Sequence, residues 1–484
     1  MPVPEEPGFQ FNGPDRRDPR PCACTVTSTV GNGSGNGYLM SNPGATRYHV
    51  PMTVPSAAEP PFDPGWLDTL AGACRGLTAS TPRLQDVYLE RRLELRMYAL
   101  AGSSHAEESR SEGAAARWRY PSRTAFHART GTSQPALEDL LSRHGRRTEL
   151  PRVRPPAPGE LEPPPGWHDW ALQTLSRVRL GHCTVRFLAR RAAVVGPDRW
   201  AAVSCPELVR VAVDGESPSA LLAVWQHPEL ESWLSELLAP PPARRWRPDP
   251  GLKVPVLLRS GTAGVLLHEL IGHLVESDLV SSGDSPLAAL SGAAVTAVAL
   301  DIVDDPGRGD LPGAFSCDDE GVAASELPLV HAGRLVGWLC DRAGSRRLGA
   351  PDGRGRRASW ARPPVPRLSN LIVAPGTTEA DDIQRELREG LLVTRLGGAM
   401  VDPLAGRIVL RVERGWELRQ GRRRRALEPF ELTGGALDVL AHVEPAVGSD
   451  PRPDWRLGWC VKDGVPLPTG SEAPTLLVHH LEVL

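Results

Sequence analysis

The stretch Ala263-Gly-Val-Leu-Leu-His-Glu-Leu-Ile-Gly-His-Leu-Val-Glu-Ser-Asp-Leu279 carries the strongest structural signal in this chain of 484 residues. Its leucine, isoleucine and valine residues recur at helical spacing and form a broad apolar stripe, which predicts a buried helix. His268, Glu269 and His273 fall off that stripe together. The stretch therefore predicts a helix that sits in a core and still presents three chemically active side chains.

The spacing of the two histidines predicts a distortion of this helix. His273 is the fifth residue after His268, whereas the commoner His-Glu-x-x-His zinc motif separates its histidines by four. At about 100° per residue, the two imidazoles point about 140° apart on an ideal helix. A π-type turn, which closes hydrogen bonds from residue i to residue i+5, would bring both rings to one ion, and Gly272 lowers the cost of bending there.

Two imidazoles beside a carboxylate are the side chains that hydrolytic zinc chemistry uses. Imidazole binds Zn²⁺ well, and the carboxylate of Glu269 can take a proton from water that the ion has made more acidic. A tetrahedral catalytic site needs a third protein ligand, for which Glu276, Asp278 and the distant Cys460 are candidates. Without further signals, two histidines on a buried helix are more often ordinary core residues than metal ligands.

The composition of the chain narrows its possible partners. Basic and acidic residues number 55 and 58, so no overall charge attracts nucleic acid or an anionic membrane. The longest apolar stretches fall short of the roughly 20 residues that a membrane span requires, and the N-terminus lacks the features of a secretory signal. We therefore predict a cytoplasmic protein with neither a nucleic-acid nor a membrane partner, whose eight cysteines are free thiols or metal ligands.

The fold class predicted from these patterns is α+β, with two domains. Residues 1–51 are rich in Gly, Pro, Asn and Ser and are predicted to be a disordered extension. Residues 52–245 are predicted to form a mixed α/β N-terminal domain, and a proline-rich stretch, 240–255, marks the boundary. Residues 255–484 are predicted to form a predominantly β C-terminal domain that carries the metal-binding helix.

Local patterns within these domains predict individual elements. Apolar spacing predicts a helix from Trp66 through Cys74 and a strand over 84–98. In the C-terminal domain, short apolar runs between Gly, Asp and Pro turns predict strands. These runs are Val295 to Val303, Leu335 to Leu339, Ile408 to Val412 and Thr475 to Val478.

The segment from Gly264 to Asp278 resembles the signature of the TldD/PmbA family, specifically its catalytic TldD-type subunit. Residues 261–484 fit this resemblance well, and 84–238 fit it faintly. The chain departs from the family at Leu270-Ile271 and at Ser277. Further blocks that agree in order are Ile302-Val-Asp-Asp305, Cys317-Asp-Asp-Glu-Gly321, Gly353-Arg-Gly-Arg-Arg357, Pro364-Val-Pro-Arg-Leu-Ser-Asn370 and Gly458-Trp-Cys-Val-Lys-Asp-Gly464.

The resemblance implies a zinc metallopeptidase with one Zn²⁺ in each catalytic subunit. By position, His268, His273 and Cys460 would hold the ion, and Glu269 would act as general base and acid. The implied partner is a related, metal-free TldE/PmbA-type subunit in a heterodimer that admits short or unfolded peptides. Family members remove leader segments from ribosomally made peptides. The residues expected to line the substrate cleft are Asp318, Asp319, Glu320, Arg367 and Asn370.

Two other functions are compatible with the sequence. The chain could be a non-catalytic binding or regulatory subunit, although a purely structural metal site has no need of the carboxylate of Glu269. It could also be a hydrolytic tailoring enzyme of a secondary-metabolite pathway that acts on a small amide. A comparison of long peptides with a dipeptide-like substrate would separate this second alternative from a peptidase.

Overall fold

The computed structural model describes residues 62–484, except for residues 80–81, 101–102, 143–149, 151–160, 179–181, 198, 215–218, 241, 243–244 and 457. The predicted disorder of residues 1–51 therefore concerns residues outside the described part of the chain. Among the helices that are described, none has both the length and the apolar character needed to cross a membrane.

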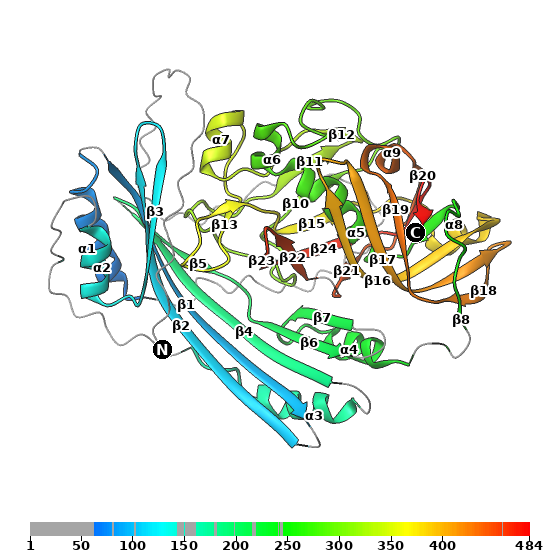
Figure 1. The fold of residues 1–484 in the computed structure, drawn as a ribbon, viewed down its shortest axis with the longest axis horizontal. Coiled ribbons are helices and arrows are strands. Elements are labelled where there is room, and N and C mark those ends of the chain that lie inside the picture. Colours follow the sequence, from blue (N-terminus) through cyan, green and yellow to red (C-terminus); the bar gives the residue numbers. More distant parts are fainter. Residues whose placement is uncertain are drawn as a thin grey trace.

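The N-terminal part is built on a long, twisted antiparallel sheet, which runs through the lower left of Figure 1. Its described strands follow the order β3-β2-β1-β4-β6-β7, and β5 also pairs with β4. The strands are β1 (Arg83–Leu100), β2 (Ser103–Arg119), β3 (Thr124–Thr130), β4 (His182–Val195), β5 (Trp200–Ser204), β6 (Leu208–Asp214) and β7 (Ser219–Val224). The helices of this part are α1 (Pro64–Arg75), α2 (Gln134–Leu141), α3 (Trp167–Arg177) and α4 (Leu230–Leu238).

Strand β1 is covered on both faces because its side chains alternate between two partners. Val87 and Leu89 share a core with α1 and α2, and Leu93, further along the same face, belongs to a core with α3 and α4. Tyr88 and Glu90 point the other way, toward the C-terminal part, where Tyr88 shares a cluster with Cys317. One face of the sheet therefore packs on helices and the other on the C-terminal part.

The C-terminal part contains two larger sheets and two hairpins among its described residues. The nine-stranded sheet follows the order β20-β25-β9-β16-β17-β18-β8, with β19 pairing both β17 and β26. The six-stranded sheet follows the order β12-β11-β10-β15-β24-β21, and the hairpins are β13-β14 and β22-β23.

The bounds of the C-terminal elements are as follows. The strands of the nine-stranded sheet are β8 (Arg245–Trp246), β9 (Val256–Leu258), β16 (Glu389–Asp402), β17 (Arg407–Arg419), β18 (Arg422–Leu427), β19 (Phe430–Gly435), β20 (Val443–Val447), β25 (Leu476–Val478) and β26 (Glu482–Val483). The strands of the six-stranded sheet are β10 (Ile302–Asp304), β11 (Leu327–His331), β12 (Arg334–Leu335), β15 (Asn370–Val373), β21 (Arg452–Asp454) and β24 (Gly470–Ala473). The hairpin strands are β13 (Gly355–Arg356), β14 (Val365–Pro366), β22 (Trp459–Lys462) and β23 (Val465–Pro468). The helices are α5 (Thr262–Leu267), α6 (Ser277–Ser282), α7 (Arg342–Leu348), α8 (Ala380–Glu386) and α9 (Ala436–Ala441).

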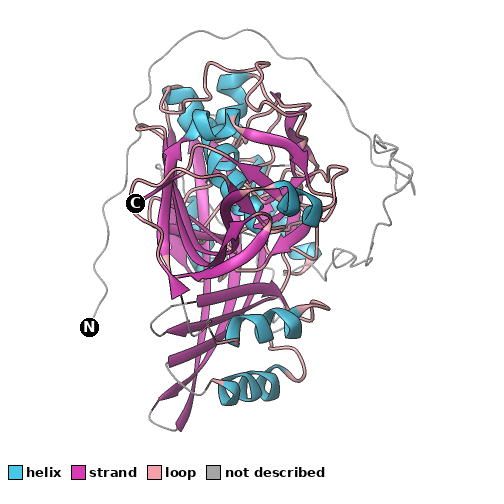
Figure 2. Ribbon diagram, turned by 90° about the vertical axis from the view of Figure 1, so that its right-hand side faces the viewer, coloured by secondary structure: helices cyan, strands magenta, loops and turns pink. Residues whose placement is uncertain are grey.

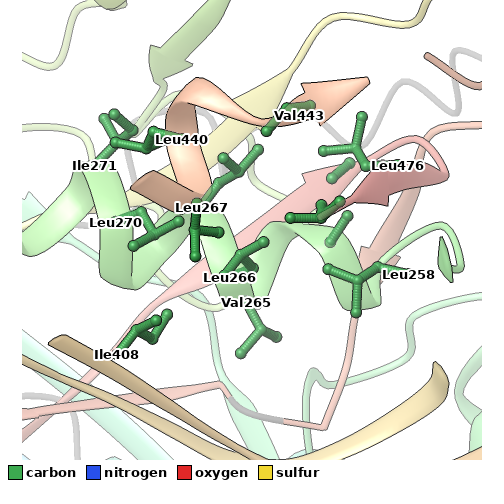
Figure 3. Close-up of a cluster of buried hydrophobic side chains, with 14 of the residues drawn as sticks. Leu258, Val265, Leu266, Leu267, Leu270, Ile271, Ile408, Leu440, Val443 and Leu476 are labelled. Carbon is green, nitrogen blue, oxygen red and sulfur yellow. The ribbon is translucent and has the colours of Figure 1, made fainter. Parts of the chain in front are cut away.

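Helix α5 lies at the centre of the C-terminal core. All of its residues are buried, and it contacts β16 of the nine-stranded sheet and β24 of the six-stranded sheet. Figure 3 shows Leu266, Leu267 and Leu270 of this helical segment among apolar side chains of β17, α9 and β25. A helix that is apolar all round has to be enclosed in this way, because it has no face to offer to water.

The predicted α+β fold class is confirmed, with a largely β C-terminal part; Figure 2 shows the strands of both parts in magenta. The helix expected from Trp66 and the strand over 84–98 are present as α1 and β1. The strand expected over 295–303 is wrong for most of its length, because only Ile302–Asp304 pairs. The domain boundary stays a prediction, although β8 already pairs with β18 of the nine-stranded sheet.

Candidate metal centre

The turn that carries the two histidines is a π-helix, His268–Gly272, which follows α5 directly. The backbone N–H of His273 donates to the carbonyl oxygen of His268, which is the predicted i to i+5 hydrogen bond. The two imidazole rings lie with their centroids 5.0 Å apart and their planes at 89°. The distorted turn therefore places on one side of the helix two rings that an ideal α-helix would separate.

Cys460 joins this pair from the hairpin β22-β23. Its Sγ atom lies 3.1 Å from Nε2 of His273. The candidate ligand atoms of His268, His273 and Cys460 all lie within 4.8 Å of one another. Burial alone would raise the pKa of the Cys460 thiol, but the two neighbouring histidines outweigh it and hold that pKa well below its ordinary value. The thiolate, which is the form that binds metals, is thereby favoured.

This group of side chains fits a zinc ion. Two imidazoles and a thiolate are ligands that Zn²⁺ prefers, and three protein ligands leave the fourth position of a tetrahedron open, as catalytic zinc sites do. Burial lowers the pKa of His273, yet Glu276 and Cys460 outweigh burial and raise that pKa well above its ordinary value. An ion that binds His273 therefore has to displace a proton.

Glu269 lies beside the candidate ligands. Its side chain is buried, and burial is the main cause that raises the pKa of its carboxyl. Together with His268 it lines a cavity of about 100 Å³. The other residues of the predicted site, among them His273 and Cys460, do not line this cavity. The other lining residues are Val265, Gly398, Ala399, Asp454, Trp459, Thr469, Gly470 and Ser471. A carboxylate at such a wall can exchange a proton with a molecule held in the cavity.

Glu276 and Asp278, the alternative third ligands, lie on the far side of His273. Glu276 Oε1 is 3.3 Å from Nδ1 of His273, whereas Cys460 faces Nε2. Lys462 Nζ is 2.7 Å from Glu276 Oε2 and 2.6 Å from Asp278 Oδ2. The geometry therefore groups Cys460 with the two histidines. Glu276 lies at the other nitrogen of the His273 ring, and Asp278 lies beside Lys462.

Of the residues expected to line the substrate cleft, one reaches the centre. Arg367 Nη2 donates to Cys460 Sγ at 3.0 Å and to the Cys460 carbonyl oxygen at 2.6 Å. Asn370 lies elsewhere, where its side chain accepts from the backbone N–H of Gly313 and donates to the carbonyl oxygen of Asp305.

The three acidic residues of that set face the N-terminal sheet and the loops beside it. Asp319 pairs with Arg190, and Glu320 pairs with Arg117. Asp318 accepts hydrogen bonds from backbone N–H groups, among them that of Gly355 at 2.9 Å. Burial is the main cause that raises the pKa of Asp318 to about 7. A role in the cleft for these buried residues stays a prediction.

Sequence analysis missed most of the cavity wall. Gly397-Gly398 in an apolar strand was the available signal, because glycine inside a strand often marks a bulge or a close approach of backbone to a ligand. The pairing of β16 with β17 is indeed irregular around Leu396 and Gly398. Thr469 and Ser471 gave no comparable signal, since they line the cavity through β24, which begins directly after Thr469 and contacts α5 from a distant part of the sequence.

A second group of three potential ligands lies on the surface near α9. Asp438, His442 and His480 are all exposed, and their candidate ligand atoms also lie within 4.8 Å of one another. The two rings are stacked, with centroids 3.7 Å apart and planes at 10°. Because the lone pair of a ring nitrogen lies in the ring plane, stacked rings do not aim their nitrogens at one ion.

The C-terminal part, which carries the helix and hairpin of the candidate centre, matches the family model described as the PmbA/TldA metallopeptidase C-terminal domain over residues 251–484. This part of the chain belongs to the TldD/PmbA family, as its motifs predicted. A metalloprotease TldD homolog of Buchnera aphidicola is 31% identical over 230 residues, 47% of each chain. One of Haemophilus influenzae is 30% identical over 231 residues, 48% of each chain.

The curated relatives match only in part, since the alignments span about half of their length. A solved structure, TldE from Thermococcus kodakarensis, covers 86% of this chain and 99% of its own with a TM-score of 0.62. Its sequence identity is 13%, so this likeness shows the fold alone. The family fold therefore extends through the N-terminal sheet, where the sequence resemblance is faint.

Proposed function

We propose that this chain is a zinc-dependent peptidase in which His268, His273 and Cys460 hold the ion and Glu269 moves protons. The observation that carries the proposal is the position of Glu269, a buried carboxylate on the wall of a cavity and adjacent to the candidate ligands. A purely structural metal site does not require such a group. The relatives named metalloproteases support a peptidase in general.

The residues of the centre have two separate roles in hydrolysis, metal binding and proton transfer. When bound, the ion supplies a Lewis acid that polarises a peptide carbonyl and makes water more acidic. Glu269 takes the proton from the attacking water and then gives it to the leaving amine. His268 and Glu269 line the same cavity, so the ion and the group that moves protons would act on the same bound molecule.

Strand β16 offers a backbone edge to an extended peptide. It pairs with β9 only at Leu391–Val393, whereas its pairing with β17 continues to Asp402. Gly398 and Ala399 of this strand line the cavity together with His268 and Glu269. A peptide that adds to this edge would be held by main-chain hydrogen bonds, largely independent of its sequence. Short or unfolded peptides, including leader segments, are therefore the proposed substrates.

The proposed partner is a related, metal-free TldE-type subunit. The likeness of the fold to TldE supports a shared architecture, which two related subunits of a heterodimer would have. Mixing the purified chain with a candidate subunit and measuring the mass of the complex tests this part. A complex of one copy of each chain is expected, and a persistent monomer would refute it.

The substitution Glu269→Gln tests the catalytic proposal. The variant should bind zinc like the wild type and lose peptide cleavage by at least a hundredfold, because Gln cannot take a proton. Asp438→Asn, which changes an exposed carboxylate away from the centre, is the control and should keep both properties. Cleavage by Glu269→Gln at a rate near that of the wild type would refute the role of Glu269. Faster turnover of a dipeptide-like amide than of longer peptides would favour a tailoring enzyme.

A further inference from the structure

Behind the candidate ligand His273 lies a buried ion pair. The side chain of Glu276 is fully buried, and its Oε1 atom lies 3.3 Å from Nδ1 of His273. Its other oxygen lies 2.7 Å from Nζ of Lys462. Cys460 lies on the opposite side of the ring, 3.1 Å from Nε2. The imidazole is therefore held between a carboxylate at one nitrogen and a thiol sulfur at the other.

Lys462 is brought to this place by the hairpin that carries Cys460. The two residues are separated by one position in β22, so their side chains leave the strand on the same face. Lys462 compensates the charge of Glu276, which would be costly to bury alone. The hairpin thus contributes both a candidate ligand and the counter-ion of the carboxylate behind the next ligand.

Asp278 provides a useful contrast within the same cluster. Its Oδ2 atom lies 2.6 Å from Lys462 Nζ, so it shares the lysine with Glu276. Its other oxygen accepts a hydrogen bond from the backbone N–H of Leu279. The two carboxylates carry the same charge and share one lysine, but Glu276 is the one beside the ring of His273.

We propose that Glu276, held by Lys462, is the positioning residue of His273; this rests on the proposed zinc site. The carboxylate charge of Glu276, 3.3 Å from Nδ1, favours the tautomer with its proton on that nitrogen, so the lone pair of Nε2 points toward Cys460 and the ion. A neutral imidazole carries one N–H, and a hydrogen bond at one nitrogen selects the other as the ligand. Removing such a partner of a ligating histidine typically weakens metal binding by roughly 10- to 100-fold.

The substitution Glu276→Gln tests this role because Lys462 Nζ, 2.7 Å from Oε2, holds the amide oxygen more closely than Arg367, whose Nε lies 3.8 Å from Oε1. The ammonium group attracts the amide oxygen, so the amide nitrogen faces Nδ1 and donates to it. That hydrogen bond favours the tautomer with its proton on Nε2. A protonated Nε2 has no free lone pair and therefore cannot bind the ion. An isosteric change at a position that contacts no ion is therefore expected to weaken zinc binding.

The experiment measures zinc affinity of the full chain by competition with a chromophoric chelator. Glu276→Gln should bind zinc roughly 10- to 100-fold more weakly than the wild type, and the control Asp278→Asn should stay within about threefold. Glu276→Asp keeps the charge but withdraws it from the ring, so it should also lose at least about tenfold. In the zinc-loaded protein, the downfield proton resonance of the His273 Nδ1–H should move in Glu276→Gln and not in Asp278→Asn.

Each outcome separates this inference from the proposed function. If the wild type binds zinc and Glu276→Gln and Glu276→Asp bind it equally well, Glu276 does not position His273, while the zinc site stands. If Asp278→Asn loses as much affinity as Glu276→Gln, charge alone matters and the inference is wrong. If the wild type binds no zinc, the proposed function and the inference fall together.

Discussion

The Sγ atom of Cys460 lies 3.1 Å from Nε2 of His273, although 187 positions separate the two residues in the chain. A helix in the core and a hairpin near the C-terminus thus meet at one point. The π-turn aligns the two histidines, and the hairpin supplies the sulfur. Neither segment carries all three candidate ligands. A substitution in the helix or in the hairpin therefore tests the contribution of each segment separately.

Metal content should follow this geometry. We expect about one zinc per wild-type chain and loss of that zinc in Cys460→Ser and in His273→Ala, because two remaining ligands hold zinc weakly. Elemental mass spectrometry of the purified proteins measures this. The control His442→Ala removes an imidazole of the exposed group and should keep its zinc. Zinc that persists in Cys460→Ser would return Glu276 and Asp278 as candidates for the third ligand.

Arg367 should support zinc binding through the sulfur. Its guanidinium donates to both Sγ and the carbonyl oxygen of Cys460, so Arg367→Met should lower zinc affinity about tenfold. Arg356→Met is the matched control, because Arg356 is also buried and donates instead to the carbonyl oxygens of Leu368 and Pro468. A chelator competition on both variants decides the matter. Equal losses would mean that any buried arginine of this region affects the site only through stability.

Helix α5 should tolerate no side chain at Gly264. A Cβ atom there would lie 2.7 Å from Ser471 Oγ and 2.9 Å from Ser471 Cβ, which is overpacking. Gly264→Ala should therefore destabilise the protein by about 1–3 kcal/mol, despite the better helix propensity of alanine. Thermal unfolding followed by circular dichroism measures the change.

Gly72→Ala is the control for that substitution. Gly72 lies inside α1, and its Cβ position meets nothing within 4 Å. Alanine at this position should raise the thermal midpoint slightly, since glycine in a helix interior costs about 0.5–1 kcal/mol relative to alanine. A stable Gly264→Ala variant would show that β24 can move away from α5.

Glu90 should make the stability of the protein sensitive to acid. Burial opposes its charge, but Arg92 and Arg190 outweigh burial and lower the pKa of Glu90 from 4.5 to about 2. A carboxyl with a lowered pKa stabilises the fold fully above its unfolded pKa, and this contribution disappears as the pH falls from about 4.5 toward about 2. The contribution is at most about 3 kcal/mol.

Glu90→Gln should flatten that dependence. Its urea midpoint should be lower than that of the wild type at pH 6, and the two should converge as the pH approaches about 2.5. Glu94→Gln removes a partly exposed carboxylate from the same strand and is the control. Parallel curves for Glu90→Gln and the wild type would show that Glu90 does not carry the acid sensitivity.

The sequence predicted those elements whose pattern is local. The helical spacing before His268, the extra residue between the histidines and the helix from Trp66 each have a local physical cause, and the structure contains all three. The proximity of Cys460 was implied by family resemblance, because no local pattern links a hairpin to a helix that precedes it by so many positions. Its role and that of Glu269 stay proposals.

The failures have a common cause, which is that burial does not require regular structure. Val295, Val298 and Leu300 are apolar because they are buried, yet their backbone is irregular, and the N–H of Val295 donates to the distant carbonyl oxygen of Gly333. The run was therefore mistaken for a strand. The cavity could not be predicted either, since its wall combines Gly398 with Ser471 of a different sheet.

The distance in sequence between the helix and the hairpin also sets an order of events during synthesis. At roughly 5–20 residues per second, a ribosome needs roughly 10–40 s to proceed from His273 to Cys460. Strand β24, which contacts α5, follows later still. Ribosome-bound chains arrested before residue 460 should bind no zinc at the helix, whereas chains that expose residues 460–478 should bind it. A nascent chain would therefore carry an incomplete candidate metal centre until the hairpin has been synthesised.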